Sequence, residues 1–205
     1  MTQGHNQYPE MLEEIISAFK GLPGIGRRTS ERIALAMVKW QPGKLEHLGE
    51  LLRTLPQTVT FCPECGNLAA HGRPCGICES PSRDRNIICV VEDFSQIVSI
   101  ESSAFYKGVY HVLGGKLSPL ENKHAGMLKI DSLLRRIETL QVKEVILALS
   151  QDVEGQATTV YIGSLLKGRE LKITRLARGL PAGSDISYAD SATIGAALNG
   201  RIPLN

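Results

Sequence analysis

Apolar residues recur at helical spacing through the first quarter of the chain. Over residues 9–20 and 29–40 they return every third or fourth position, which is the period of one helix face. The segments GLPGIG and QPG that follow these stretches are too rich in glycine and proline to continue a helix. The pattern therefore predicts three helices, over about 9–20, 29–40 and 45–54.

From residue 86 onward, short apolar runs of β type alternate with helical stretches. The runs are IICVVE, VYHVL, EVILAL and LKITRL, and helical spacing falls on 127–140 and 157–166 between them. Strands that alternate with helices indicate an α/β domain with a mostly parallel sheet. A Gly-rich tail follows, with a short helix expected near 191–198.

Four of the five cysteines lie between these two regions. Cys62 and Cys65 form one CxxC pair, and Cys75 and Cys78 form a second pair after nine intervening residues. Each pair places two thiolates on one tight turn, and two such turns can close a tetrahedron around Zn²⁺. Because four sulfur ligands leave no position open for water, we expect one structural zinc ion, whose binding supplies the folding energy of this segment.

Two alternatives to a four-cysteine zinc site are open. A redox role would need only one CxxC pair, so two pairs at this spacing favour the metal. His71 lies between the pairs and could be a ligand, although four cysteines already complete the shell. Cys89, inside the IICVVE run, is expected to be a buried small apolar residue.

Composition and charge narrow the class of protein. The 205 residues are 42% hydrophobic and 21% charged, with no apolar run long enough to span a bilayer and no signal-like start, so we expect a cytoplasmic protein without a membrane partner. The net charge of +2 does not by itself indicate a nucleic-acid partner. Residues 20–39 and 167–178 nevertheless each hold five bases against one acid, which fits a protein that grips phosphates locally. Solvated helix faces are the alternative.

The LPGIG string at residues 22–26 joins the first two predicted helices. Gly24 and Gly26 allow a turn that exposes N–H groups at the start of the second helix, where phosphate oxygens bind, and Arg27 and Arg28 add charge beside them. Such a contact would grip the DNA backbone without sequence preference and would weaken with salt. A plain helix connection, or a hairpin used only for assembly, is the alternative.

Acidic residues follow two of the predicted strands. Glu92 ends the IICVVE run, and Asp152 and Glu154 follow EVILAL, so parallel strands would bring them to one crevice. This arrangement resembles the Mg²⁺ site of Toprim domains in topoisomerases and primases. No tyrosine stands in a nucleophile context, so no catalytic residue is assigned, and loop capping or partner binding is the alternative. Lys116, in GKLSPL, lacks the glycine spacing of a nucleotide-binding loop.

These motifs, in this order, resemble the RecR family of bacterial recombination mediators over nearly the whole chain. The resemblance is carried by LPGIGRRTSERIA, the four cysteines, ICVVED, YHVLGGKLSPLE, EVILALSQDVEGQATTVYI and RLARGLPAGSDISYADSATIGAALNGR. One departure is the segment 150–152, Ser-Gln-Asp, where the family pattern has an Asn-Pro-containing turn.

The resemblance implies an α/β protein of four parts. These are a helix–hairpin–helix region at 1–54, a four-cysteine zinc finger at 55–80, a Toprim-like domain at 81–176 and a C-terminal oligomerisation segment at 177–205. It also implies a non-enzymatic DNA clamp, typically a tetrameric ring closed through its N- and C-terminal regions, with no small-molecule substrate. Together with RecO or RecF, such a clamp helps to load RecA at single-stranded gaps, on gapped DNA or at junctions of single and double strands.

Site residues carry over from the resemblance by position. It makes the four clustered cysteines the zinc ligands and makes Glu92 and Glu154 partner-binding acids that attract a basic protein such as RecO. A Mg²⁺-dependent Toprim-type nuclease or topoisomerase-like enzyme is one alternative, and a zinc-dependent scaffold whose hairpin serves only oligomerisation is another. The DNA-binding positions at the hairpin would be Lys20, Gly24, Gly26, Arg27 and Arg28.

Overall fold

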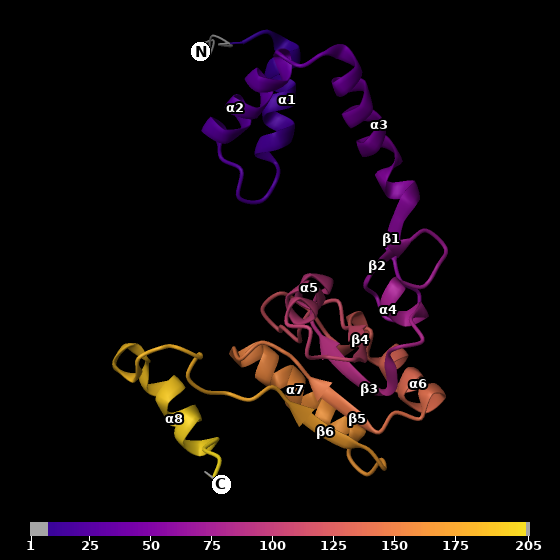
Figure 1. Ribbon diagram of the computed structural model, residues 1–205, viewed down its shortest axis with the longest axis vertical. Coiled ribbons are helices and arrows are strands. Elements are labelled where there is room, and N and C mark those ends of the chain that lie inside the picture. The colour runs from indigo at the N-terminus through magenta and orange to yellow at the C-terminus, as the bar shows by residue number, and fades with distance from the viewer. Residues whose placement is uncertain (1–7, 204–205) are drawn as a thin grey trace. The chain divides into compact units, whose positions relative to one another are not determined.

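The computed structural model describes residues 8–203, which fall into two compact units divided between Thr58 and Val59 (Figure 1). Within these residues, no helix is long and apolar enough to cross a membrane. The α/β fold class is confirmed: helices form the first unit, and a parallel sheet with helices forms most of the second.

The first unit consists of three helices. Helices α1 (Glu10–Lys20) and α2 (Arg27–Val38) pack against each other, with Ile16 and Ala34 buried. Helix α2 begins two residues earlier than the sequence pattern predicts, because Gly26 already has the extended conformation of an N-cap. Helix α3 (Pro42–Thr58) is longer than predicted and has no buried residue.

The second unit opens with the cysteine-rich segment. A two-stranded antiparallel hairpin, β1 (Val59–Phe61) and β2 (Leu68–Ala70), is followed by the single-turn helix α4 (Gly76–Glu79). The sequence did not predict these elements, since each is too short to show a periodic pattern.

A four-stranded parallel sheet in the order β4-β3-β5-β6 forms the core of the second unit (Figure 1). The strands are β3 (Asp84–Val91), β4 (Gly108–Val112), β5 (Glu144–Leu147) and β6 (Lys172–Arg175). Each overlaps one of the predicted apolar runs, although β3 begins three residues before its run. The chain crosses from one side of β3 to the other between β4 and β5, so a ligand crevice is expected at the carboxyl ends of these strands.

Alternate residues of β3 face two apolar layers. Ile88 and Val90 belong to the layer that holds α6 (Ile130–Leu140) and α7 (Val153–Leu166). Cys89 and Val91 face the opposite layer, which holds α5 (Phe94–Ser102). Burial on both faces explains why the strand is a continuous apolar run. It also confirms the prediction that Cys89, 2% exposed, is a buried apolar residue.

Helix α5 is absent from the sequence prediction. It has only nine residues, so its apolar period is short. A capping box marks its start. The Asp93 carboxylate accepts from the Ser95 backbone N–H at 2.9 Å, and the Gln96 side-chain oxygen accepts from the Asp93 backbone N–H. The remaining chain holds the short 3₁₀ helices η1 (Ala125–Met127) and η2 (Ile186–Tyr188) and the predicted C-terminal helix α8 (Ser191–Asn199).

Candidate functional site

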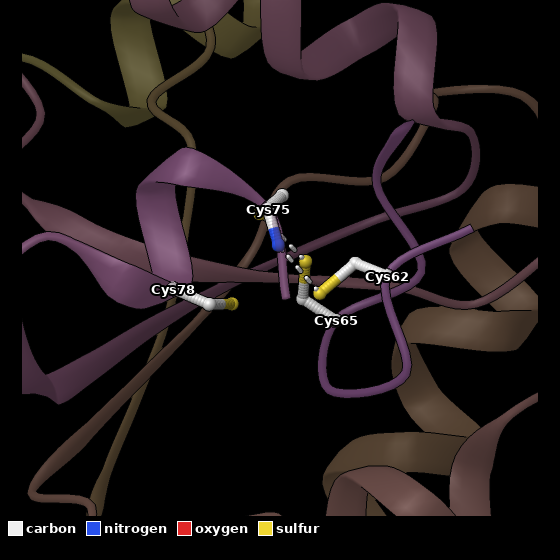
Figure 2. A group of neighbouring side chains, drawn as sticks. All are labelled: Cys62, Cys65, Cys75 and Cys78. Atoms are coloured by element: carbon white, nitrogen blue, oxygen red, sulfur yellow. Dashed lines mark hydrogen bonds between the residues drawn. The ribbon is translucent and has the colours of Figure 1, made fainter. Parts of the chain in front are cut away.

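The four clustered cysteines converge on one point. Their sulfur atoms all lie within 4.8 Å of one another, and all four side chains are buried. Figure 2 shows Cys62 and Cys65 on the loop after β1, facing Cys75 and Cys78 at the two ends of α4. The Sγ atoms of Cys65 and Cys75 are 3.6 Å apart, far longer than a disulfide and close to the ~3.8 Å edge of a tetrahedron with 2.3 Å Zn–S bonds.

Backbone N–H groups and a guanidinium surround these sulfurs. The Cys75 N–H donates to Cys62 Sγ at 3.3 Å, the Asn67 N–H donates to Cys65 Sγ at 3.4 Å, and Arg136 Nη2 donates to Cys78 Sγ at 3.4 Å. Donors of this kind stabilise thiolates. Hydrogen bonding with Cys65 and Cys78 lowers the pKa of Cys75, while hydrogen bonding with Cys65 and Cys75 raises the pKa of Cys78. A bound cation would offset the mutual repulsion of four thiolates at this distance.

The donor set therefore fits a metal ion of zinc type, held by Cys62, Cys65, Cys75 and Cys78. With no ligand position left for water, such an ion would stabilise the fold and would not activate a substrate. Among the described residues His71 does not join the cluster, and its side chain is exposed.

The cysteine cluster rests on the parallel sheet. The Val112 N–H at the end of β4 donates to the Cys65 carbonyl at 2.7 Å, and Arg85 from β3 donates to the Cys78 carbonyl at 2.8 Å. Arg136, on α6, donates through Nη1 to the Tyr110 carbonyl and through Nη2 to the Cys78 sulfur. Sequence patterns did not identify these two arginines, because neither contact follows a periodic spacing: Arg85 is seven residues from Cys78, and Arg136 is 58 residues from it.

The hairpin between α1 and α2 lies at 21–26. Gly24 has φ +76°, a left-handed conformation that favours glycine. Gly26 is the N-cap of α2, offers no side chain to cap it, and is followed by a first turn without acidic residues. The first turn of α2 therefore has neither a capping side chain nor an acidic residue, and its role in binding an anion stays a prediction.

Three basic residues lie on the two helices that flank the hairpin. Lys20 ends α1, and Arg28 lies in the first turn of α2; both residues are exposed. Arg27 Nε donates to Glu31 Oε1 at 2.9 Å, one turn further along the helix. This pair is exposed on the arginine side, so it contributes little stability and can be replaced by another anion.

The predicted acids meet at the carboxyl ends of β3 and β5, as expected. Glu92 is only 8% exposed, and its two carboxylate oxygens accept from the Ser150 N–H at 2.6 Å and the Ser150 hydroxyl at 2.8 Å. Asp152 is the N-cap of α7 and accepts from the Gly155 N–H at 2.7 Å. Glu154 is in the first turn of that helix, with 34% of its side chain exposed.

A lysine that the sequence analysis set aside lies among these acids. Lys116 forms an ion pair with Asp152, and its Nζ is 3.8 Å from a Glu154 carboxylate oxygen. The hydrogen bond that Lys116 donates to the Asp152 carboxylate raises the pKa of Lys116, and the same contact lowers the pKa of Asp152. The position of Lys116 just after β4, at the strand end where the acids gather, was the only signal for this role.

Comparison with known proteins agrees with this architecture. Family models match residues 12–55 (RecR, helix-hairpin-helix), 86–177 (Toprim domain) and 179–202 (RecR, C-terminal). Recombination protein RecR of Bifidobacterium longum subsp. infantis is 45% identical over 194 residues, covering 95% of this chain and 96% of the relative. The protein of the same name from Bifidobacterium adolescentis is 42% identical over the same shares of the two chains. The chain belongs to the RecR family of recombination proteins.

Proposed function

We propose that this protein is a non-enzymatic DNA clamp that acts as a mediator in recombinational DNA repair. It binds gapped DNA without sequence preference and, with RecO or RecF, helps to load RecA at single-stranded gaps. One zinc ion on Cys62, Cys65, Cys75 and Cys78 stabilises it, and it works in the cytoplasm on the chromosome. In this proposal the chain has four parts, at residues 1–54, 55–80, 81–176 and 177–205.

The uncapped start of α2 supports the DNA-binding part most strongly. Gly26 offers no side chain to cap the first N–H groups of the helix, Arg27 and Arg28 carry positive charge in that first turn, and Lys20 adds a further charge on the other side of the hairpin sequence. Both the positive end of the helix dipole and the basic side chains attract phosphate oxygens. Because the contact involves phosphates and no base edges, it gives affinity without sequence preference, and a clamp held in this way can slide.

Self-association is supported by apolar side chains exposed on the single chain. Helix α3 exposes 37–60% of four leucine side chains, and the C-terminal segment exposes 58–90% of a further four apolar side chains. Surfaces of this kind are typical of contacts between subunits. The residues are Leu45, Leu51, Leu52 and Leu55 in α3, and Ile186, Tyr188, Leu198 and Ile202 in the C-terminal segment.

Retention on circular DNA tests the clamp. The full-length protein is mixed at low salt with gapped circular DNA, with and without Mg²⁺, and the bound protein is measured before and after the circle is cut. We expect retention on circles, loss from the cut DNA and no new nicks. Mg²⁺-dependent nicking would support the nuclease or topoisomerase-like alternative, and no retention at any salt would support the scaffold alternative.

The role of the hairpin is tested by the double substitution Arg27→Ala with Arg28→Ala. Removing two phosphate contacts should weaken DNA binding and flatten the slope of log affinity against log salt by about 2. The matched control is Lys44→Ala with Arg53→Ala, which removes the same charge from α3 of the same unit. Equal effects of the two double variants would contradict a specific hairpin contact.

Glu154 and Glu92 are proposed to attract a basic partner such as RecO. Glu154 offers an exposed carboxylate, whereas Glu92 acts from a nearly buried position through its charge. The expected result of Glu154→Gln is weaker RecO binding that depends less on salt. Asp131→Asn, an exposed acid in the first turn of α6, is the control. Unchanged RecO affinity in Glu154→Gln would remove this part of the proposal.

A further inference from the structure

The Toprim fold implies a divalent metal bound by the acids at the carboxyl ends of the strands. The position between the acids is taken by a side chain of the protein itself. The Lys116 ammonium pairs with Asp152 and lies 3.8 Å from Glu154, with 23% of its side chain exposed. Its carboxylate partners both come from the start of α7, where a metal ion would also have to bind.

The loop that carries Lys116 is held in place. The backbone N–H of Leu117 donates to the Thr158 hydroxyl at 2.9 Å, and Thr158 is a fully buried residue of α7. The lysine is therefore anchored to the helix that carries its two carboxylate partners. Since its pKa is raised by Asp152, Lys116 carries its positive charge wherever the protein is folded near neutral pH.

The acids themselves are also engaged. Both oxygens of Glu92 accept hydrogen bonds from Ser150, and one oxygen of Asp152 caps α7 through the Gly155 N–H. Mg²⁺ requires near-octahedral oxygen ligands at 2.0–2.1 Å. To bind here it would have to displace the ammonium from Asp152 and overcome its repulsion, so the residues present do not fit the metal.

Other charged groups line the same depression, but they do not offer free ligands for a metal ion. Glu121 pairs with Lys123 at 2.6 Å, and Asp93 caps α5 through the Ser95 N–H. Each of these acids already has a partner within the protein.

We infer that Lys116 is a built-in cation that occupies the acidic site and excludes a divalent metal from it. This deepens the non-enzymatic part of the proposed function, on which it rests. The site keeps the fold of a metal centre, but Lys116 offsets part of its negative charge from within the protein. The partly exposed Glu154 carboxylate, which is 3.8 Å from the Lys116 ammonium, remains available for contact with a basic partner, while the phosphodiester chemistry that a metal would support at this position is absent.

Mn²⁺ is a suitable probe, because it takes oxygen ligands like Mg²⁺ and binds weakly to the thiolates of the cysteine cluster. Its binding to the zinc-loaded protein is measured from the loss of the free-ion signal in electron paramagnetic resonance. Three variants are compared with the wild type: Lys116→Met, Lys116→Arg, and Lys116→Met combined with Glu154→Gln.

We expect Lys116→Met to bind one Mn²⁺ at least about tenfold more tightly than the wild type, because a positive charge has been removed from among the carboxylates. Lys116→Arg should behave like the wild type, and adding Glu154→Gln to Lys116→Met should abolish the gain. No gain of affinity in a folded Lys116→Met protein would overturn the inference.

A second comparison needs no change at Lys116. Glu154→Gln alone should leave the weak Mn²⁺ binding of the wild type unchanged. If it weakens that binding, the wild-type acids already hold a metal and the inference is wrong, whether or not Lys116→Met folds. The nicking assay keeps the two proposals apart. Cleavage by the wild type would refute the non-enzymatic function, whereas Mn²⁺ binding by the wild type that Glu154→Gln weakens, without cleavage, would refute only the role of Lys116.

Discussion

Two buried cysteines, one inside the metal cluster and one outside it, offer a matched pair of substitutions. Cys78 is 3% exposed and Cys89 is 2% exposed, so changing either one to alanine removes one sulfur from a buried position. They differ in their neighbours. Cys78 lies with three other sulfurs and the Arg136 guanidinium, whereas Cys89 lies among apolar side chains in the middle of β3.

The two substitutions should therefore differ greatly in cost. Cys89→Ala removes one buried atom and should lower the free energy of unfolding by about 1 kcal/mol. Cys78→Ala removes a ligand from a site of the kind that contributes about 10–16 kcal/mol in zinc-finger peptides. Among residues 8–203, the partly buried apolar residues packed against the cysteines are Ala69 and Ile77, so little apolar burial remains to hold residues 59–80 together.

Zinc content and limited proteolysis measure the difference. We expect about one zinc per chain in the wild type and in Cys89→Ala, and close to none in Cys78→Ala. Proteases should also cut Cys78→Ala much faster within residues 59–80. A full zinc equivalent in Cys78→Ala, or loss of zinc from Cys89→Ala, would refute the assignment of the four ligands.

Two further predictions concern the α/β domain. Burial lowers the pKa of His111 to about 4, so the unfolded chain takes up a proton near pH 6.5 that the folded chain resists, and about 3 kcal/mol of stability present above pH 6.5 should be lost as the pH falls towards 4. Urea unfolding at several pH values should show a shallower loss in His111→Gln, and an equal loss would contradict this account. Gly155→Ala would place its Cβ 2.2 Å from the Ser150 carbonyl oxygen and should destabilise the protein by more than about 3 kcal/mol, whereas Gly163→Ala, with open space in the same helix, should stabilise it by about 0.5–1 kcal/mol. Thermal unfolding of both variants checks this contrast.

Much of the fold followed from local patterns. The parallel strands, the longer helices and the cysteine cluster were predicted because apolar periodicity and CxxC spacing depend on neighbours in the sequence. Helix α5 and the hairpin of β1 and β2 were missed, since each is short. The start of α2 at Arg27 was placed two residues late, because the conformation of Gly26 cannot be inferred from composition.

The sequence by itself determined which residues could do chemistry. Four thiolates in two CxxC pairs suit a zinc-type metal, two glycines before two arginines suit a phosphate, and acids after apolar runs gather at a sheet edge. These inferences needed only residue type and spacing.

The tertiary structure decided which residues contact the acids at the strand ends. Lys116 is 36 residues from Asp152 in the sequence, and Ser150 is 58 residues from Glu92, yet each pair is in direct contact. The same is true of Arg136 and Cys78, which are also 58 residues apart. Such contacts depend on strand order and on the path of the loops after β4 and β5. A counter-ion such as Lys116, on a loop far away in the sequence, leaves no periodic signal there, because the packing of the sheet determines which residues it contacts.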